Sequence, residues 1–405
     1  MNKCLVTKLN GSSNNSELLR LGEMRIKILK VQNPTEYTQG FSLGFNKPVT
    51  LEIVSDGYFT DKTLTENKGK SITLNAGINS IWVNGTHDVE IAILDKYSLT
   101  NIFCYYQGAP AGMHANNLEF NISYLKYSTA MTSLELFETK VSGDIGDLKA
   151  LTALKILNLG DTQVSGDIGD LKALTALTYL NLSDTKVSGD IGDLKALTTL
   201  SILELSDTKV SGDIGGLKTL TALSRLISNR TQVSGDIGDL KALTTLSILE
   251  LFETKVSGDI GDLKALTALT YLNLYNSQVP ITGDIGALSV LSKCTYISIN
   301  SAKLTGDIAT VPAVCRFTSF YNDKGSVFTW GTRPSTAKII AIGGQASITN
   351  IDKMLQNQAQ CQTGFSPNDE PQFKTIQVAG NRTSASDAAV ETLQQKGYTV
   401  SIAKA

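Results

Sequence analysis

The chain has 405 residues, more than one hydrophobic core usually serves, and this length predicts two or three domains. Its 36 basic and 38 acidic residues leave a formal net charge of -2. We therefore expect no long-range attraction to nucleic acid or to an anionic membrane. No run of about 18 apolar residues occurs, so we expect no segment that spans a bilayer.

The first hundred residues predict β-strands. Short segments that alternate apolar with polar residues are separated by turn signals such as Asn33-Pro34 and Asn84-Gly85. The expected strands are residues 4–9, 24–31, 49–54, 71–75, 80–84 and 89–94. We predict a β-sandwich-like domain over residues 1–103, followed by a linker over residues 104–120. This domain either anchors the protein to a larger assembly or only packs beside the next domain.

A short phrase, Gly-Asp-Ile followed by Gly-Asp-Leu-Lys-Ala-Leu-Thr, recurs through the middle of the chain. Its spacing is 23 residues, broken once by a two-residue insertion near Pro280. The triplet begins at Gly143, Gly166, Gly189, Gly212, Gly235, Gly258, Gly283 and Gly306. A fixed period of this length with leucines at fixed offsets predicts a stacked solenoid, here over residues 121–322. Residues 120–125 align with 166–171 and predict an atypical N-terminal capping repeat.

One copy, residues 166–188, resembles the leucine-rich repeat family. The family pattern L-x-x-L-x-L-x-x-N-x-L appears as Leu177, Leu180, Leu182, Thr185 and Val187, with threonine in place of the usual asparagine. The following Gly-Asp-Ile and Gly-Asp-Leu segments resemble the plant-type subclass, but its proline is missing. The resemblance implies a right-handed superhelix with one parallel strand per repeat on the concave side and non-helical turns on the convex side.

Stacking turns each recurring polar position into a column. The threonines at the asparagine position are expected to bond the backbone of the turn. The aspartates of the Gly-Asp-Ile triplets are open to two interpretations, turn capping and calcium binding. Because the nonapeptide of calcium-binding rolls is absent, we favour capping and expect no metal site.

The copies differ mainly beside the strand leucines, although residues 134–154 and 249–269 are identical. Aromatic and acidic residues on the outward side of a rigid sheet are typical of a binding face. We therefore predict that the concave face binds a partner through Glu135, Phe137, Tyr179, Asn181, Glu204, Glu250, Phe252, Tyr271, Asn273, Tyr275 and Tyr296. Free drift of exposed residues is the alternative. The copy at Leu223 has Ser228 at a leucine position, which predicts a kink or an imperfect strand.

After the array, strand and helix patterns alternate and predict an α/β C-terminal cap over residues 323–405. The expected elements are strands at 338–342, 374–378 and 398–402 and helices at 350–360 and 384–396. Ser386 is placed near an N-cap and Gly397 at a C-cap. Residues 380–387 and 396–400 are similar to the tail of leucine-rich repeat proteins of gut bacteria and their tailed phages.

No catalytic constellation is evident. His87 and His114 lie outside the array, and no nucleophile elbow, phosphate loop or dinucleotide fingerprint occurs. Five cysteines without a close pair are expected to be reduced. We expect no enzyme, no cofactor and no secretory signal.

These observations favour a recognition protein in a phage virion, as a head or tail fibre. The solenoid would contact a protein or glycan on a host surface, and residues 1–103 would contact other virion proteins, with no nucleic acid and no membrane insertion. A structural or decoration virion protein and an intracellular (cytoplasmic) bacterial interaction module are the alternatives. The oligomeric state is left open by the sequence, and a homo-oligomer is one of the alternatives.

Overall fold

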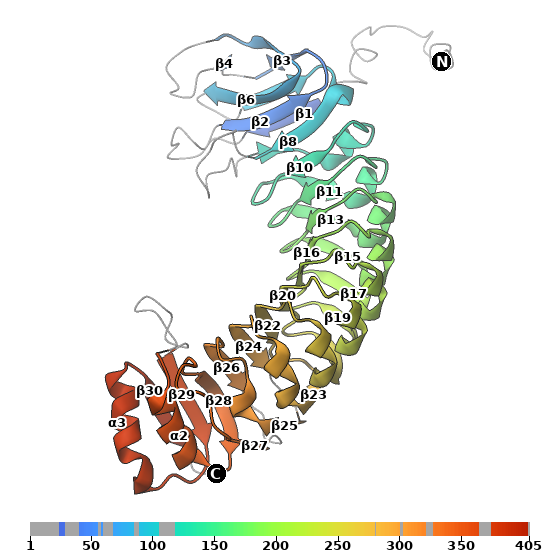
Figure 1. Ribbon diagram of the computed structural model, residues 1–405. Coiled ribbons are helices and arrows are strands. Elements are labelled where there is room, and N and C mark those ends of the chain that lie inside the picture. The colour runs from blue at the N-terminus through green and yellow to red at the C-terminus, as the bar shows by residue number, and fades with distance from the viewer. Residues whose placement is uncertain are drawn as a thin grey trace, which may run out of the picture. The chain divides into compact units, whose positions relative to one another are not determined.

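The computed structural model describes residues 24–28, 40–55, 58–59, 68–84, 89–104, 118–279, 281–299, 303–320, 327–363 and 374–403 (Figure 1). The chain forms two compact units, residues 1–143 and 144–405. The division falls between Gly143 and Asp144, inside the first Gly-Asp-Ile triplet of the array.

The first unit contains two antiparallel β-sheets. One has the order β5 (Ser71–Leu74), β3 (Val49–Ile53), β7 (Val89–Ile93), β1 (Met24–Ile28), β9 (Leu118–Glu119). In the other, β2 (Gly40–Phe45) lies between β6 (Gly77–Asn84) and β8 (Leu99–Phe103), and β4 (Tyr58–Phe59) pairs with β6. Burial alternates along β3, where Leu51 is buried, whereas residues 41–45 of β2 are all buried, Phe41 and Leu43 among them. The first unit is therefore built mainly of β-strands, as the sequence predicts.

The expected strands at 24–31, 49–54, 71–75, 80–84 and 89–94 correspond to β1, β3, β5, β6 and β7, whereas the one at 4–9 lies outside the described residues. β2 and β8 were not predicted. In β2, glycines at positions 40 and 44 interrupt the apolar alternation on which a strand prediction depends. Of the expected linker, residues 118–119 form β9, and residues 105–117 lie outside the described part of the chain.

The parallel stack begins within the first unit. β10 (Ser133–Glu135) pairs with β8 in parallel register, and Asn121 forms a parallel bridge to Ser142, which begins β11 (Ser142–Asp144). Two short 3-10 helices, η3 (Lys96–Ser98) and η4 (Ile122–Leu125), complete this unit. In η4 the Asn121 side chain accepts a hydrogen bond from the Ser123 N–H at 2.9 Å, as the aspartates do in later repeats.

Every repeat of the second unit begins with a short strand that pairs in parallel with its copies. In the pair β14 and β16, Leu180 lies opposite Leu203, and neighbouring pairs keep this register. These first strands are β12 (Ile156–Asn158), β14 (Tyr179–Asn181), β16 (Ile202–Glu204), β18 (Arg225–Ile227), β20 (Ile248–Glu250), β22 (Tyr271–Leu274), β24 (Tyr296–Ile299) and β26 (Phe317–Phe320). They line the inner side of the curved stack in Figure 1.

Each repeat also has a second strand, which the sequence analysis did not predict. These strands pair with a stagger, so that Gly189 lies opposite Val210. They are β13 (Gln163–Asp167), β15 (Lys186–Asp190), β17 (Lys209–Asp213), β19 (Gln232–Asp236), β21 (Lys255–Asp259), β23 (Ile281–Asp284), β25 (Lys303–Asp307) and β27 (Val327–Thr329). The expected strand count of one per repeat is therefore corrected to two.

The turns expected to be non-helical contain 3-10 helices. They are η5 (Ile145–Leu148), η6 (Ile168–Ala173), η7 (Ile191–Ala196), η8 (Ile214–Thr219), η9 (Ile237–Ala242), η10 (Ile260–Ala265), η11 (Ile285–Val290) and η12 (Ile308–Thr310). Each begins after the triplet aspartate, whose side chain accepts a backbone N–H two residues on; Asp190 accepts the N–H of Gly192 at 2.8 Å. The predicted capping role of these aspartates is confirmed.

The leucine columns form the core of the array. Leu177, Leu180 and Leu182 have no exposed surface, and the equivalent leucines of the other repeats are equally buried. The threonine column is buried as well, and the Thr185 hydroxyl donates to the carbonyl of Leu182 at 2.6 Å. The predicted bond from these hydroxyls to the turn backbone is thus confirmed.

The predicted kink at the Leu223 copy is wrong. β18 pairs with β16 and β20 over the same three residues as its neighbours. Ser228 is fully buried at the leucine position, and its hydroxyl lies 3.2 Å from that of Thr231. Because this hydroxyl has a buried partner, the backbone keeps the path of the other repeats.

The stack continues into an α/β end, as predicted. β26, β28 (Ala341–Ile348), β29 (Thr375–Ala379) and β30 (Thr399–Ala403) pair in parallel. α2 (Ile351–Gln360), η14 (Ser384–Ser386) and α3 (Asp387–Gln395) connect the last three. Gly397 has the left-handed conformation expected of a C-cap, with φ 87°. Ser386 occupies the N-cap position of α3, as expected, but its hydroxyl makes no capping bond and donates to Asp352 instead.

The cysteines at positions 104, 294, 315 and 361 are buried, and within the described part of the chain no disulfide joins them. Cys4 and both histidines lie outside the described residues. Among the helices described, none is long and apolar enough to cross a membrane.

Candidate functional site

The outward side of the first-strand sheet, here called the concave face, carries the residues selected from the sequence. In the second unit, Tyr179, Glu204, Glu250, Phe252 and Tyr296 are half-buried. Except for Phe252, which lies beyond β20, their backbones are fixed by parallel pairing on both sides, for example Tyr179 between Ile156 and Ile202. Glu135 and Phe137, in the first unit, are also half-buried, and Glu135 accepts the hydroxyl of Ser133 at 2.8 Å.

Two of the selected residues support the backbone. The side-chain oxygen of Asn181 accepts the N–H of Ser183 at 2.9 Å, and that of Asn273 accepts the N–H of Tyr275 at 3.1 Å. Asn273 is buried, with 8% of its surface exposed. Their side-chain oxygens thus hold the bends that follow β14 and β22. The aromatic and charged side chains are therefore the larger groups of the concave face that can contact a partner.

Two tyrosines of adjacent repeats form a flat platform. The rings of Tyr271 and Tyr296 are 4.1 Å apart at their centroids and nearly parallel, at 3°. Burial, followed by the neighbouring Tyr296, raises the pKa of Tyr271 well above its ordinary value. The register that places Tyr271 opposite Tyr296 creates this stack. Tyr275, one residue beyond β22, is half-buried on the same repeat.

Two arginines of one divergent repeat each contact an acid of the preceding repeat. Nε of Arg225 lies 2.7 Å from Oε1 of Glu204. Arg230 donates to both carboxylate oxygens of Asp207, from Nε at 2.7 Å and from Nη2 at 3.1 Å. The Arg230 guanidinium also lies 5.2 Å from the centroid of the Phe252 ring. Neither arginine was selected from the sequence. The signal was present as a single basic residue in each of two repeat columns, Arg225 between Ile202 and Ile248 and Arg230 between Asp207 and Glu253.

Asn229 connects this repeat to the next. Its amide nitrogen donates to Oε2 of Glu250 at 3.2 Å, and its oxygen accepts the N–H of Phe252 at 3.1 Å. The divergent repeat therefore orients two of the selected residues, Glu250 and Phe252.

The residue that ends each strand bend has a left-handed backbone, with φ between 51° and 56°, and is usually acidic. This left-handed column comprises Glu138, Asp161, Asp184, Asp207, Arg230, Glu253 and Asn276. Burial, followed by the charges of Asp207 and Asp161, raises the pKa of Asp184. In this column acidic residues thus precede Arg230, and Glu253 and Asn276 follow it.

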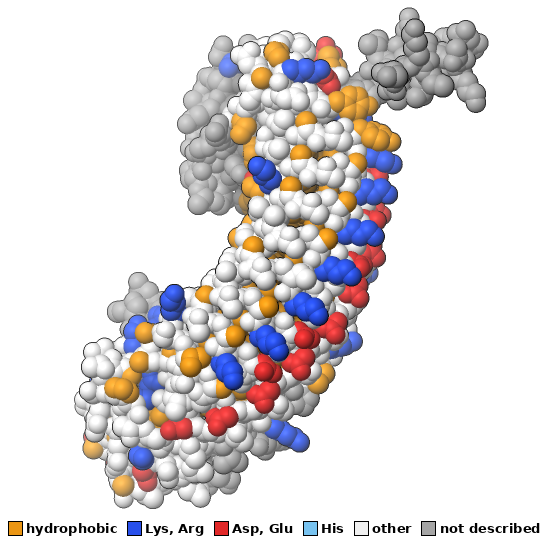
Figure 2. Space-filling view, turned by 45° about the vertical axis from the view of Figure 1, so that its right-hand side comes forward, with side chains coloured by type: hydrophobic (Ala, Val, Ile, Leu, Met, Phe, Trp, Pro, Cys, Tyr) orange, Lys and Arg blue, Asp and Glu red, His pale blue; other side chains and the backbone are white. Residues whose placement is uncertain are grey.

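Away from this face, charged side chains run in rows along the stacked repeats (Figure 2). The exposed lysines of the 3-10 helices, such as Lys172, Lys195 and Lys241, recur at the repeat spacing. Among the residues described, no group of three or more His, Cys, Asp or Glu side chains is placed to hold a metal ion.

The repeat spacing, the buried leucine columns and the parallel first strands agree with a comparison against protein families. The model described as "Leucine-rich repeat region" matches residues 130–321. These residues are a leucine-rich repeat region. Such regions are generally protein-interaction modules, and no catalytic family is indicated. Among curated proteins, none matches the chain.

Several solved structures are similar to the chain in fold. The plant peptide hormone receptor RGFR1 in complex with RGF2 has a TM-score of 0.52 at 17% identity, over 71% of this chain and 50% of the receptor. An internalin from Listeria monocytogenes has a TM-score of 0.46 at 22% identity, over 68% of this chain and 90% of the internalin. The chain thus spans half the length of the plant receptor. At these identities the similarity is one of fold.

Proposed function

We propose that the concave face of the leucine-rich repeat region binds a protein partner without catalysis. One observation carries this proposal: repeats that are nearly identical in their core and turns differ on this face, and the differing residues contact one another. Arg225, Arg230 and Asn229 of one repeat hold Glu204, Asp207 and Glu250 of its neighbours.

The chemistry of the face fits a polypeptide ligand. Half-buried aromatic rings and arginines supply most of the energy in protein interfaces. Phe252, Tyr271, Tyr275 and Tyr296 supply such rings at the end of the face nearer the C-terminus. The plant receptor of the same fold is solved with RGF2, which supports the idea that a sheet of this shape accepts a protein ligand.

A selection from a displayed library of random peptides on the immobilised full chain tests this proposal. We expect enriched peptides to bind the wild type and to lose at least about tenfold in affinity for a Phe252→Ala, Tyr271→Ala, Tyr275→Ala triple variant. A Lys195→Ala, Lys241→Ala variant, altered away from the concave face, is the matched control and is expected to bind like the wild type. Equal binding by the aromatic variant and the wild type, with unchanged melting, would reject the concave face as the site.

The setting that we propose is a phage virion, with the protein as a head or tail fibre that contacts a protein or glycan on a host surface. Two observations support it: the β-sandwich-like unit, which suits attachment through residues 1–103, and the similarity of residues 380–387 to the tails of phage-encoded leucine-rich repeat proteins. Peptide mass spectrometry of purified virions tests whether the protein is a virion component. Detection in stoichiometric amounts is the expected result, whereas confinement to the bacterial cytoplasm would favour an intracellular interaction module. Virions that lack the protein but still adsorb would favour a structural or decoration role.

A further inference from the structure

The last strand of the stack, β30, has one edge without a strand partner among the described residues. It pairs with β29 along its full length. The N–H of Gly380 donates to the carbonyl of Ala403 at 3.0 Å, so the backbone groups of Ala403 point towards β29. Because these groups alternate along a strand, those of Thr399 and Ser401 point the same way, and those of Val400 and Ile402 point to the opposite edge.

Within its described residues, β30 lacks the features that usually prevent strand pairing. Edge strands are commonly protected by charged residues, proline or a bulge. The sequence of β30 is Thr-Val-Ser-Ile-Ala, and its pairing with β29 has no shift of register. Thr399 and Ser401 are exposed, whereas Val400 and Ile402 are only half-buried.

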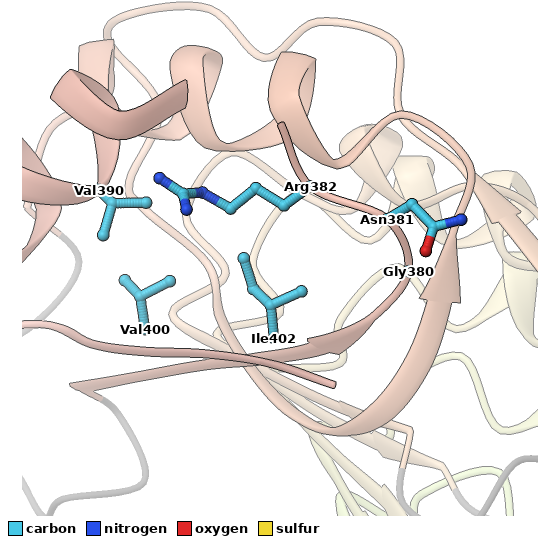
Figure 3. A pocket seen from close by; sticks show the side chains of 6 residues that line it. All are labelled: Gly380, Asn381, Arg382, Val390, Val400 and Ile402. Carbon is cyan, nitrogen blue, oxygen red and sulfur yellow. The ribbon is translucent and has the colours of Figure 1, made fainter. Parts of the chain in front are cut away.

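A pocket of about 350 Å³ lies on the same side of β30 as Val400 and Ile402. It is lined by Gly380, Asn381, Arg382, Val390, Val400 and Ile402. Figure 3 shows Val400 and Ile402 side by side on the strand, pointing towards Arg382. The guanidinium of Arg382 is already engaged, since it donates to Ser386 at 3.0 Å and to Asp387. Val390, Val400 and Ile402 therefore form the apolar part of a pocket next to an edge whose backbone groups have no strand partner among the described residues.

We propose that β30 pairs with β30 of a second copy of this chain, in antiparallel orientation about a two-fold axis at Ser401. In this register Val400 lies opposite Ile402 of the partner subunit, and Ile402 lies opposite the partner's Val400. Both residues direct their N–H and C=O groups to the outer edge, so the two positions become hydrogen-bonded pairs. In this pairing every outward N–H and C=O group of Val400 and Ile402 has a hydrogen-bond partner, and no like charges within β30 face each other.

The same register adds apolar side chains beside the pocket. Residues opposite each other in an antiparallel pair project on the same face of the sheet. A second valine and isoleucine consequently lie beside the pocket and remove the half-exposed side chains of Val400 and Ile402 from water. Such an interface uses the same surface on both copies, as two-fold dimers do. Because it involves one short edge and its pocket, we expect a weak dimer whose population rises with concentration.

Sedimentation velocity over a range of concentrations of the full chain tests the association. The wild type is expected to show a monomer–dimer equilibrium. Val400→Pro removes an N–H from the outer edge and none from the pairing with β29, so we expect it to weaken the dimer about tenfold or more with the helical and strand signal retained. Thr399→Lys, on the opposite face of β30, is expected to dimerise like the wild type. A wild type that stays monomeric throughout, or a Val400→Pro variant that dimerises equally well, would overturn the proposal.

A disulfide test fixes the register. In a Cys4→Ser background, Ser401→Cys places two cysteines opposite each other across the two-fold axis, at a separation that a disulfide can bridge. Mild oxidation is expected to give a covalent dimer in which the residue 401 cysteines are joined. Thr399→Cys is the matched control, because it lies opposite Ala403 of the partner subunit and is expected to cross-link much more slowly. Equal cross-linking of the two variants would reject this register.

Discussion

The guanidinium of Arg230 binds the carboxylate of Asp207 with both Nε and Nη2, although the residues are 23 positions apart in the chain. Both have the left-handed conformation that ends the strand bend of each repeat, with φ 52° for Arg230 and 55° for Asp207. Stacking places equivalent bends side by side, so a single basic residue in an acidic column meets an acid of the preceding repeat. The left-handed column therefore has one cation among neighbours that repel one another.

Arg230→Glu restores an acid to this column and is expected to lower the free energy of unfolding by about 1–2 kcal/mol at low salt, since like charges then lie on adjacent repeats. The loss should shrink in high salt because exposed charges are screened. Urea denaturation at two salt concentrations measures both effects. Arg230→Gln, the control, removes the ion pair without adding repulsion and is expected to lose less. A loss independent of salt would indicate backbone strain instead.

Asp184→Asn is expected to raise the melting temperature at neutral pH. Burial and the charges of Asp207 and Asp161 raise the pKa of Asp184, so its ionised form is disfavoured in the folded state. Folding is therefore favoured by protonation of Asp184, and this contribution is lost as pH rises through the folded-state pKa. Asparagine removes the charge and tolerates the φ of 55°. The gain should shrink as pH falls through the folded-state pKa and be gone below the unfolded-state pKa. A gain that persists there would contradict the electrostatic explanation.

Asp352→Asn is expected to act with the opposite sign. Its carboxylate accepts the hydroxyls of Ser386 at 2.6 Å and Thr383 at 2.5 Å, and these bonds lower its pKa. The stability that it contributes is present above the unfolded-state pKa and is lost as pH falls through the lower folded-state value. The variant should melt below the wild type at neutral pH and approach it in acid. A constant difference across the pH range would show that the carboxylate charge is not the cause.

Gly189→Ala is expected to destabilise the array by about 1–3 kcal/mol. Gly189 has φ 115°, and a Cβ there would press against Oδ1 of Asp167, which caps the preceding 3-10 helix. Gly192→Ala is the matched control, because a Cβ at that position first meets Asp190 at 3.1 Å and next an atom at 3.8 Å. Thermal denaturation of the two variants compares their melting temperatures, and we expect the larger drop for Gly189→Ala. Equal losses would mean that the left-handed backbone is not what requires glycine.

Leu180→Ala is expected to cost about 2–5 kcal/mol, since Leu180 is fully buried between Leu157 and Leu203 and its neighbours cannot collapse onto the space. Lys186→Ala, an exposed change in the same repeat, should alter stability by less than about 0.5 kcal/mol. Guanidinium denaturation gives both values. Similar small losses for the two variants would show that the repeats repack freely around a missing leucine.

The candidate site was foreseen only in part. Tyr271, Tyr296 and Phe252 could be selected because they break the monotony of the repeats at outward positions. Arg225 and Arg230 were missed, because their meaning depends on Glu204 and Asp207, which lie a full repeat away. Asn181 and Asn273 were selected by position, yet their oxygens turned out to hold the strand bends. A polar side chain in a sequence does not show whether its hydrogen bonds go to its own backbone or to a partner.

The sequence by itself determined the stacked architecture, because a unit of 23 residues with one apolar edge buries its leucines only against identical copies. It also determined the threonine bonds and the aspartate caps, since both connect residues two or three positions apart. The second strand and the 3-10 helix of each repeat, the Tyr271–Tyr296 platform and the Arg230–Asp207 pair were decided by the tertiary structure. The strand pairing and the side-chain contacts join residues 21 to 25 positions apart, and only the register between neighbouring repeats brings such residues together.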